Sequence, residues 1–313
     1  MNCLLIGGAG FIGKNLAFHL AKNGHNIMVY DCIESPFLSS REMRIQYIKG
    51  DYFRNVISDE VIMRQDIIFL LACSVGPKTS MDNPEICYGQ DIVRMIQLLE
   101  QMITHDVSKL FFISSGGTVY GNSDVETFSE DMETLPINHY GIMKLTQEKI
   151  LLMYNNLYGM KNIIFRLSNP YGCGQKVSSG IGAVTAFMNQ ICREEKISVY
   201  GKGEVIRDYI YIDDVVEMIR LFLERGRFES VNPVFNIGTG VGTSIIELVR
   251  IIERITGKNA DIEFKESRKI DVNKNVLNNK KIKTIIGEYK CSSLMAGISE
   301  YYNMIERGMD NIG

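Results

Sequence analysis

The sequence predicts an α/β protein, a doubly wound parallel sheet with a smaller C-terminal lobe. Short apolar runs alternate with amphipathic stretches through the first half of the chain, as in parallel sheets with helices on both faces. A glycine-rich turn joins the first apolar run to the first amphipathic stretch. The length of 313 residues is enough either for one large α/β domain or for such a domain with an appended lobe.

Five apolar runs are predicted as buried strands because they are short and continuous, without the 3.6-residue period of a helix. They are NCLLI, NIMVY, RIQYI, DIIFLL and KLFFI. Between them, the stretches FIGKNLAFHLAKNG and NPEICYGQDIVRMIQLLEQMITHD carry the amphipathic pattern of helices. The alternation of strand and helix predicts right-handed crossovers and a parallel sheet.

The turn GGAGFIG places Gly7, Gly10 and Gly13 at three-residue spacing between the first strand and the first helix. Glycine is needed where the chain turns tightly, where the backbone approaches a pyrophosphate, and where a helix lies close to a strand. The first turn of the helix, with Phe11 and Ile12, offers free N–H groups to phosphates. We assign these five residues to a dinucleotide site.

Two acids and one small residue follow the next strands. Asp31 ends the second run, where a carboxylate accepts hydrogen bonds from an adenosine ribose and repels a 2′-phosphate, so NAD is favoured over NADP. Asp51 follows the third run and is assigned to the adenine amine. Ala72, after the fourth run, completes the predicted cofactor contacts. Simpler roles stay open: a turn cap for Asp31 and a loop acid for Asp51.

Tyr140 and Lys144 stand four residues apart in the predicted helix NHYGIMKLTQEKILLMYNNLYG. Side chains four apart share one helix face, so the two are expected to be neighbours. A phenol has a pKa of about 10, but a nearby ammonium and a positive nicotinamide ring favour the phenolate and lower that pKa. We therefore assign Tyr140 as acid and base, and Lys144 as its electrostatic partner and a ligand of the nicotinamide ribose.

Several motifs occur in a fixed order along the chain: GGAGFIG, the acid after the second run, SSGGTVYG, YGIMK, NPYG and RDYIYIDDV. In this order they resemble the extended short-chain dehydrogenase/reductases. The closest resemblance is to the nucleotide-sugar epimerase/dehydratase group, with the UDP-glucose 4-epimerases nearest. It runs over nearly the whole chain, from Met1 to about Tyr302.

The resemblance implies an NAD-binding Rossmann domain in residues 1–170, completed by a strand and a helix from the second half. Residues 171–313 would form mainly the lobe for a nucleotide-diphosphate sugar. It also implies a homodimer formed by the helices around residues 84–105 and 140–158.

The resemblance further implies a 4-epimerase that acts on a UDP-hexose or UDP-N-acetylhexosamine through a transient 4-keto sugar. The phenolate of Tyr140 would take the proton of the sugar 4-hydroxyl while NAD accepts the hydride. Two other hypotheses stay open: a nucleotide-sugar 4-keto reductase or another C4-oxidising enzyme, and a sensor of NAD or sugar nucleotides that has lost catalysis.

The segment ISSGGTVYG departs from the pattern of the resembling enzymes. Their catalytic serine or threonine, three places before the valine, falls on Gly116. Ser115 and Thr118 are the neighbouring hydroxyls that can replace it, or they serve only to cap the strand end and satisfy loop amides. The resembling dehydratases place a glutamate where this chain has Thr118, so threonine there argues against a dehydratase.

By the same resemblance, four residues are assigned to the substrate. Asn169 in NPYG would bind near the phosphates, and Arg207, just before a predicted strand, would clamp the diphosphate together with Arg268. Guanidinium groups suit this task because each offers a planar fork of donors. Asn275 falls near the gate of the hexose pocket, where its modest size leaves room for an N-acetyl group.

Composition excludes several other classes of function. The net charge of −3 offers no basic field for nucleic acid or anionic membranes, and no apolar run is long enough to span a bilayer. The seven cysteines contain no CxxC pair and are expected to be free thiols, as in a cytoplasmic protein. The four histidines show no ligand spacing, so no structural metal is expected.

Overall fold

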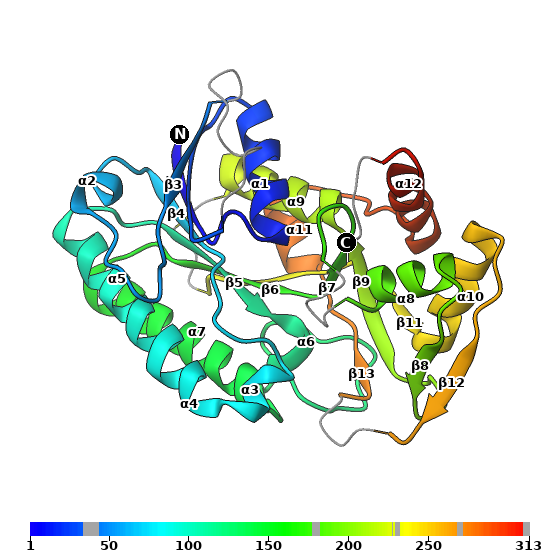
Figure 1. Cartoon of the computed structure of the whole chain (residues 1–313). Helices are drawn as coiled ribbons and strands as arrows, with labels where there is room; N and C mark the ends of the chain where they lie inside the picture. Colours follow the sequence, from blue (N-terminus) through cyan, green and yellow to red (C-terminus); the bar gives the residue numbers. More distant parts are fainter. Residues whose placement is uncertain (34–43, 177–181, 227, 229–231, 268–271, 309–313) are drawn as a thin grey trace.

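The structure is a computed structural model (Figure 1) that describes residues 1–33, 44–176, 182–226, 228, 232–267 and 272–308. Within this part of the chain, seven parallel strands form the main sheet in the order β10-β6-β5-β4-β1-β2-β3. The strands are β1 (Asn2–Ile6), β2 (Asn26–Asp31), β3 (Ile45–Lys49), β4 (Ile67–Leu70), β5 (Leu110–Ser115), β6 (Ile163–Leu167) and β10 (Val234–Ile237). This confirms the predicted doubly wound sheet.

The centre of the sheet is the point where the strand order reverses. Ile6 at the end of β1 pairs with Tyr30 of β2 on one side and with Leu70 of β4 on the other. The carboxyl ends of these strands therefore meet at one edge, beside β1, where open α/β sheets bind their ligands. The glycine-rich turn begins at this edge.

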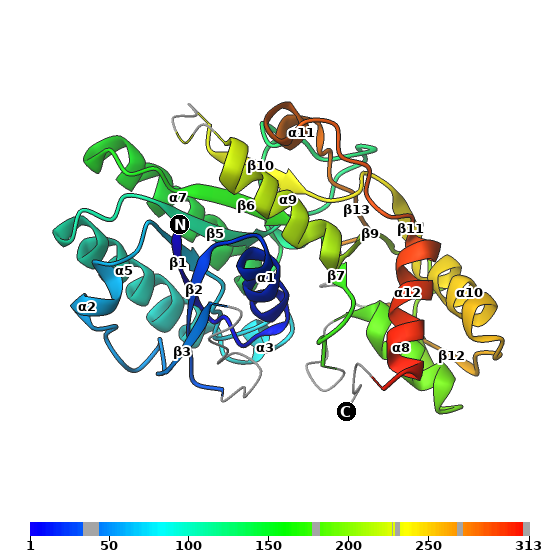
Figure 2. The ribbon, with the colours of Figure 1, turned by 90° about the horizontal axis from the view of Figure 1, so that it is seen from above.

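Helices cover both faces of the sheet, as Figures 1 and 2 show. One face carries α1 (Phe11–Lys22) and α9 (Ile212–Arg225), which pack against each other. The other face carries α5 (Val93–Thr104) and α7 (His139–Tyr158). Alternate residues of β1 serve the two faces, because Leu5 packs with the core of the first and Leu4 with that of the second.

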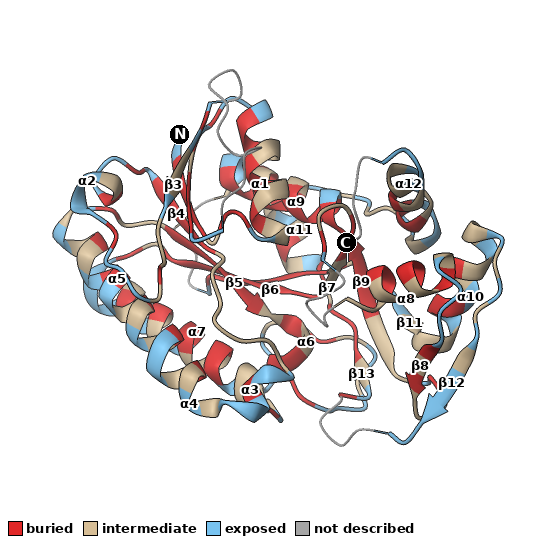
Figure 3. Cartoon of the chain, viewed as in Figure 1, coloured by how far each residue is buried: buried red, intermediate tan, exposed pale blue. Residues whose placement is uncertain are grey.

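The helix that carries the predicted catalytic pair has well-defined ends. The side chain of Asn138 caps α7 by accepting a hydrogen bond from Gly141 N at 2.8 Å. Gly159 ends the helix with a φ of 66°, a left-handed conformation that favours glycine. Figure 3 shows the buried side of α7 against the sheet and its exposed side facing outward. Tyr140 therefore lies in the first turn, beside the carboxyl ends of the strands.

The predicted helix between the fourth and fifth strands is interrupted. It consists of α4 (Pro84–Ile86), a π-helical segment η2 (Cys87–Ile92) and then α5. A π-helical turn frees a backbone carbonyl from the usual ladder, and such turns are frequent at functional sites. Within this segment, the backbone carbonyl of Asp91 accepts a hydrogen bond from Gln147 of α7 at 3.3 Å.

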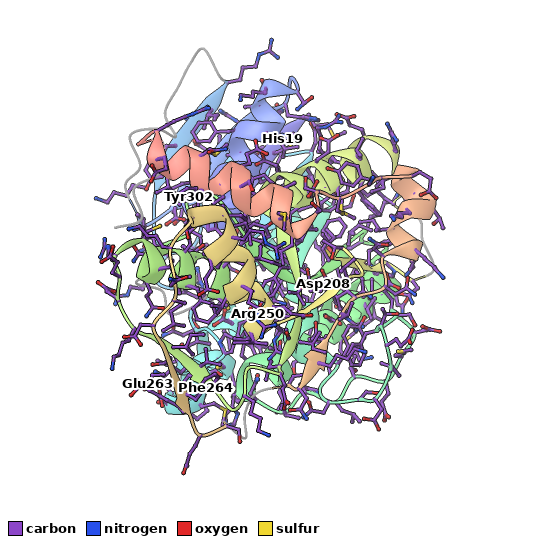
Figure 4. All side chains as sticks on the ribbon, turned by 90° about the vertical axis from the view of Figure 1, so that its right-hand side faces the viewer. His19, Asp208, Arg250, Glu263, Phe264 and Tyr302 are labelled. Atoms are coloured by element: carbon purple, nitrogen blue, oxygen red, sulfur yellow. The ribbon has the colours of Figure 1, made fainter. Side chains whose placement is uncertain are left out.

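The C-terminal lobe lies beside the carboxyl edge of the sheet (Figure 1). Its strand β9 pairs with β7, β11 and β13, while β8 pairs with β12. The bounds are β7 (Asn169–Tyr171), β8 (Ile197–Tyr200), β9 (Ile206–Tyr211), β11 (Gly242–Ser244), β12 (Ile262–Lys265), β13 (Lys274–Asn275), α8 (Ala183–Cys192), α10 (Ile245–Thr256) and α12 (Leu294–Glu306). In Figure 4, Asp208 of β9 lies well inside the outline of the molecule, whereas Phe264 of β12 lies at its rim.

Short helices complete the described structure: α2 (Asp59–Ile62), α3 (Thr79–Asp82), α6 (Gly116–Val119) and α11 (Lys280–Ile286). No helix in the described ranges has both the length and the apolar character needed to cross a membrane. The same residues contain no cluster of histidine, cysteine and carboxylate side chains able to hold a metal ion.

Candidate active site

The glycine-rich turn is built by close backbone contacts that only glycine permits. Gly7 has a φ of 82°, and a Cβ there would lie 2.5 Å from Ala72 N. A Cβ on Gly13 would lie 2.5 Å from the Cα of Gly8, so this glycine lets α1 start close to β1. Both positions explain why the turn is restricted to small residues. Ala72, a predicted cofactor contact, lies directly against this turn.

Gly10 has a different environment, and it is the position that fits a ligand. A Cβ built there would meet only the carbonyl oxygen of Gly7, at 3.3 Å, so that its side-chain direction is otherwise open. Gly10 precedes α1, and the N–H groups of Phe11 and Ile12 have no carbonyl four residues earlier in the helix to accept their hydrogen bonds. An open approach to free amides at a helix N-terminus fits the pyrophosphate of NAD.

Asp31 is buried at the end of β2 and is already hydrogen bonded. Its Oδ2 accepts from Ala9 N and its Oδ1 from Ile33 N, each at 2.9 Å. The carboxylate thus holds the glycine-rich turn in place, which is the turn-capping role left open in the sequence analysis. Its negative charge also lies where an adenosine ribose is expected. Asp51 similarly accepts from Phe53 N at 2.9 Å and lies 3.5 Å from the guanidinium of Arg54.

Tyr140 and Lys144 are neighbours on α7, as their spacing predicts. The Nζ of Lys144 lies 5.7 Å from the centroid of the Tyr140 ring and 4.6 Å from that of Phe112. The ammonium donates a hydrogen bond to Ile113 O at 3.1 Å, and the side chain is only 4% exposed. The strand β5 therefore fixes the lysine beneath the tyrosine. A cation held there stabilises a developing phenolate.

The surroundings of Tyr140 include groups that the sequence analysis missed. Its backbone N–H donates to Ser80 Oγ at 3.2 Å, which ties α7 to the loop after β4. Burial, followed by the nearby Cys73 thiol and the Asp91 carboxylate, raises the pKa of Tyr140 well above its usual value. The sequence does carry an indication of Asp91, because it lies four residues from both Cys87 and Met95 and so shares a buried helical face with them. Carboxylates are rarely buried unless they have a bonding partner or a functional role.

The hydroxyls near β5 have different environments. Ser115 is half-buried at the end of the strand, and its side-chain hydroxyl makes no hydrogen bond within the described part of the chain. Thr118 Oγ1 is enclosed in the protein and lacks a partner there. A Cβ on Gly117 would lie 3.8 Å from Ser115 Oγ and 4.0 Å from Asn169 Oδ1, so these two polar atoms flank the same open direction.

The predicted substrate residues are partly brought together. Asn169 donates to Asp208 O at 3.0 Å, and Asn275 donates to Gly116 O at 2.7 Å. Both asparagines therefore lie against the strand ends near β5. Arg207 lies inside β9 rather than before it, because the strand begins at Ile206, which corrects the predicted boundary. Arg268 lies outside the described residues.

Asn275 has a further property that suits a binding site. Its side chain is fully buried, with Nδ2 bonded to Gly116 and Oδ1 without a partner among the described residues. A buried amide oxygen without a hydrogen bond is costly, and a ligand hydroxyl or amide would relieve that cost.

Two surface cavities lie away from the strand ends. One, of about 180 Å³, lies between α2 and α5, and one of about 330 Å³ is lined by Glu194, Lys258, Asn259 and Asp261. Neither has a predicted site residue in its wall. We place the site at the strand ends instead, because the glycine turn, Tyr140 and Lys144 converge there from separate elements.

Comparisons with known proteins identify the family. The model of the "NAD dependent epimerase/dehydratase family" matches residues 3–238. The UDP-glucose 4-epimerase of Mycolicibacterium smegmatis is 30% identical, with 96% of this chain and 97% of that protein aligned. The dTDP-4-dehydro-6-deoxyglucose reductase of Escherichia coli is 31% identical, with 91% of each chain aligned.

Solved structures agree with this result. The crystal structure of the UDP-glucose 4-epimerase of Thermotoga maritima with UDP-glucose is 32% identical and superposes with a TM-score of 0.88, over 99% of this chain and all of that one. The family match covers more than half of the chain, and the glycine turn fits the cofactor for which the family is named. The chain therefore belongs to the NAD dependent epimerase/dehydratase family and is an NAD-dependent enzyme of the nucleotide-sugar epimerase type.

Proposed function

We propose that the protein is an NAD-dependent nucleotide-sugar 4-epimerase that acts on a UDP-hexose or UDP-N-acetylhexosamine. The observation that carries the proposal is the pairing of Tyr140 with Lys144 at the carboxyl end of β5. This pair is suited to moving a proton on and off a sugar hydroxyl. The similarity to two UDP-glucose 4-epimerases supports the substrate class.

In the proposed reaction, the phenolate oxygen of Tyr140 takes the proton of the sugar 4-hydroxyl. Lys144 holds a positive charge beside the ring and stabilises the phenolate. Bound NAD would supply the redox chemistry, as acceptor for the C4 hydride and as its donor to the other face of the 4-keto sugar. Tyr140 then gives the proton back to the C4 oxygen, so that substrate and product differ only in configuration at C4.

The remaining residues are proposed to hold the two ligands. The amides of Phe11 and Ile12 would bind the pyrophosphate of NAD, with Asp31 at the ribose and Asp51 at the adenine. For the sugar nucleotide, residues 171–313 would supply most of the contacts. Within this lobe we assign Arg207 and Arg268 to the diphosphate and Asn275 to the hexose, with Asn169 from the neighbouring strand β7.

The test is incubation of the purified protein with UDP-glucose and, separately, UDP-N-acetylglucosamine, with no added coenzyme. Proton NMR should show the C4 epimer accumulating to equilibrium, and the Tyr140→Phe variant should show none. Turnover that requires a stoichiometric supply of NADH or NADPH would contradict the proposal. The Escherichia coli reductase similarity makes a 4-keto reductase the second candidate, which that outcome would favour.

A sensor without catalytic activity was the remaining hypothesis from the sequence. The family membership and the tyrosine–lysine pair favour an enzyme. Loss of epimerisation in Tyr140→Phe, with the parent active, would exclude the sensor. An inactive parent that still binds NAD and UDP-sugars would support it.

We also propose that the protein forms a homodimer through α5 and α7. Apolar side chains stand exposed on the outer faces of these helices: Val93, Ile142, Met153 and Leu157. An exposed apolar face of this kind typically marks an interface. Light scattering should give twice the mass of 35.5 kDa, and Leu157→Glu should give the monomer.

The seven cysteines are free, which suits our placement of the enzyme in the reducing cytoplasm.

A further inference from the structure

Asp91 is a buried carboxylate that the proposed reaction does not use. Its side chain is 2% exposed, and Oδ1 accepts a hydrogen bond from Ser74 N at 3.1 Å. The hydroxyl of Ser74 donates to its other oxygen. From the π-helical segment, its backbone carbonyl also accepts from Gln147 of α7 at 3.3 Å. Asp91 thus connects the loop after β4 to the helix that carries the catalytic pair.

Asp91 lies near the proposed catalytic groups, because its carboxylate is bonded to Ser74, the residue after Cys73, and its backbone carbonyl to Gln147, about one turn along α7 from Lys144. Burial, opposed by Lys144 and reinforced by Asp91, raises the pKa of the Cys73 thiol to about 11. Both charges therefore lie within electrostatic reach of this sulfur, and the sulfur is in turn within reach of Tyr140. The Nζ of Lys144 lies 5.7 Å from the Tyr140 ring centroid. Because the Asp91 side chain is buried, water screens its negative charge only weakly.

The groups around Tyr140 come from several elements. Titratable or charged side chains on the elements packed against its end of α7 are Cys73 after β4, Asp82 of α3, Tyr88 and Asp91 of η2, and His139 and Lys144 of α7. Asp82 is exposed, and the His139 ring is bonded to Tyr88 at 2.8 Å. Glu148, one turn beyond Lys144 on α7, is paired with Arg166 at 2.7 Å. The buried charges without an ion-pair partner among these described groups are the Lys144 cation and the Asp91 anion.

We propose that Asp91 is a positioning residue: its carboxylate fixes the loop beneath Tyr140 and opposes loss of the Tyr140 proton. The proposal rests on the role assigned to Tyr140 above. A nearby anion makes a phenolate less favourable, whereas Lys144 makes it more favourable. Tyr140 therefore keeps its proton until further positive charge is brought close to it. In this way Asp91 restricts proton removal to the state in which the positively charged nicotinamide ring is in place.

The test compares Asp91→Asn with the wild-type holoenzyme. Asparagine keeps the size and an acceptor for Ser74 but removes the charge. Ionisation of Tyr140 is read from the near-ultraviolet absorbance of tyrosinate, after subtraction of the Tyr140→Phe signal at each pH. In Asp91→Asn we expect Tyr140 to ionise at lower pH. The acid limb of the kcat profile should move the same way, raising the rate below the limb about tenfold for each pH unit of displacement.

Asp214→Asn is the matched control. Asp214 is also a buried carboxylate that accepts from one hydroxyl, Tyr289 at 2.7 Å, and one backbone amide, Ser292 at 2.9 Å. It lies on α9, away from Tyr140, so its replacement should leave the tyrosinate titration unchanged. Asp91→Glu keeps the charge and should restore the wild-type profile.

An unchanged titration in folded Asp91→Asn and Asp91→Ser would overturn the proposal, whatever their activity. Failure of both neutral variants to fold, judged by circular dichroism, would also overturn it in favour of a purely structural role. These outcomes are separate from the fate of the proposed function. That function fails if Tyr140→Phe remains active, a result that does not depend on the absorbance titration of Asp91→Asn.

Discussion

Leu277 fills the space into which a side chain at Gly116 would point. A Cβ built on Gly116 would lie 2.4 Å from Leu277 Cδ1, although 160 residues separate the two in the chain. Leu277 is fully buried in a small cluster with Val119, Tyr120 and Phe128. The position that carries a catalytic hydroxyl in the resembling enzymes is thus packed against a hydrophobic side chain in this protein. Leu277 leaves room there only for glycine.

Gly116→Ser should destabilise the fold rather than restore a catalytic group. Overpacking a buried contact costs about 1–3 kcal/mol, and urea unfolding should show a loss of that size. Gly117→Ala is the control, because the space beside it is open and its Cβ would meet nothing closer than 3.8 Å. Combining Gly116→Ser with Leu277→Ala should cost less than the sum of the two single changes. Strict additivity would show that the contact is not the cause.

Ser115→Ala should lower kcat by about 10²-fold, the low end for loss of a group that assists proton transfer. Ser115 is half-buried at the end of β5, and its hydroxyl makes no hydrogen bond within the described residues, so that it is free to reach a ligand. Thr118→Val, which keeps the shape of an enclosed side chain, should change kcat far less. The reverse ranking in steady-state assays would assign the helping hydroxyl to Thr118. No effect of either change would mean that Tyr140 works without a protein hydroxyl.

The parts of the site that depend on local sequence were predictable. The glycine turn requires small residues at fixed spacing, and its position between a strand and a helix identifies it. The pairing of Tyr140 with Lys144 needed only the helical repeat, and the structure places both on one face of α7. In each case, the residues that form the pattern lie within seven positions of one another, although Gly7 also contacts the distant Ala72.

The parts that depend on tertiary contacts were not predictable. No local pattern shows that Leu277 meets Gly116, or that Arg207 lies within a strand rather than before it. The π-helical segment was also missed, because its amphipathic pattern is that of an ordinary helix over residues 83–106. The position of Asp91 on one helical face with Cys87 and Met95 indicates burial, but its contacts with Ser74, which lies 17 positions earlier, do not follow from that pattern.

Asp31→Asn should weaken NAD binding and reduce the preference for NAD over NADP. Both carboxylate oxygens accept backbone hydrogen bonds, from Ala9 and Ile33, and an amide group satisfies only one of them. Removing the charge also removes the repulsion of a 2′-phosphate. Calorimetric titration with each cofactor measures the ratio. As a control, Asp51→Asn should weaken both cofactors equally, because the adenine is common to them. A ratio unchanged in Asp31→Asn would leave that residue with its turn-capping role alone.

Replacing Glu148 by leucine should destabilise the protein by about 3–5 kcal/mol, because it leaves Arg166 as a buried charge without its partner. The two side chains are almost fully buried, and Arg166 Nη2 lies 2.7 Å from Glu148 Oε2. Glu148 lies on α7 one turn beyond Lys144, and Arg166 on β6, so the pair fastens the catalytic helix to the sheet.

Urea unfolding of a matched series tests this arrangement. Adding Arg166→Met to the leucine variant should recover part of the loss, since an apolar pair replaces a broken ion pair. The exposed pair of Lys265 with Glu263, 3.4 Å apart, is the control, and Glu263→Gln should cost less than about 1 kcal/mol. If Glu148→Leu costs no more than Glu263→Gln, the helix is held by its apolar contacts. Tyr140 and Lys144 would then keep their places without the buried pair.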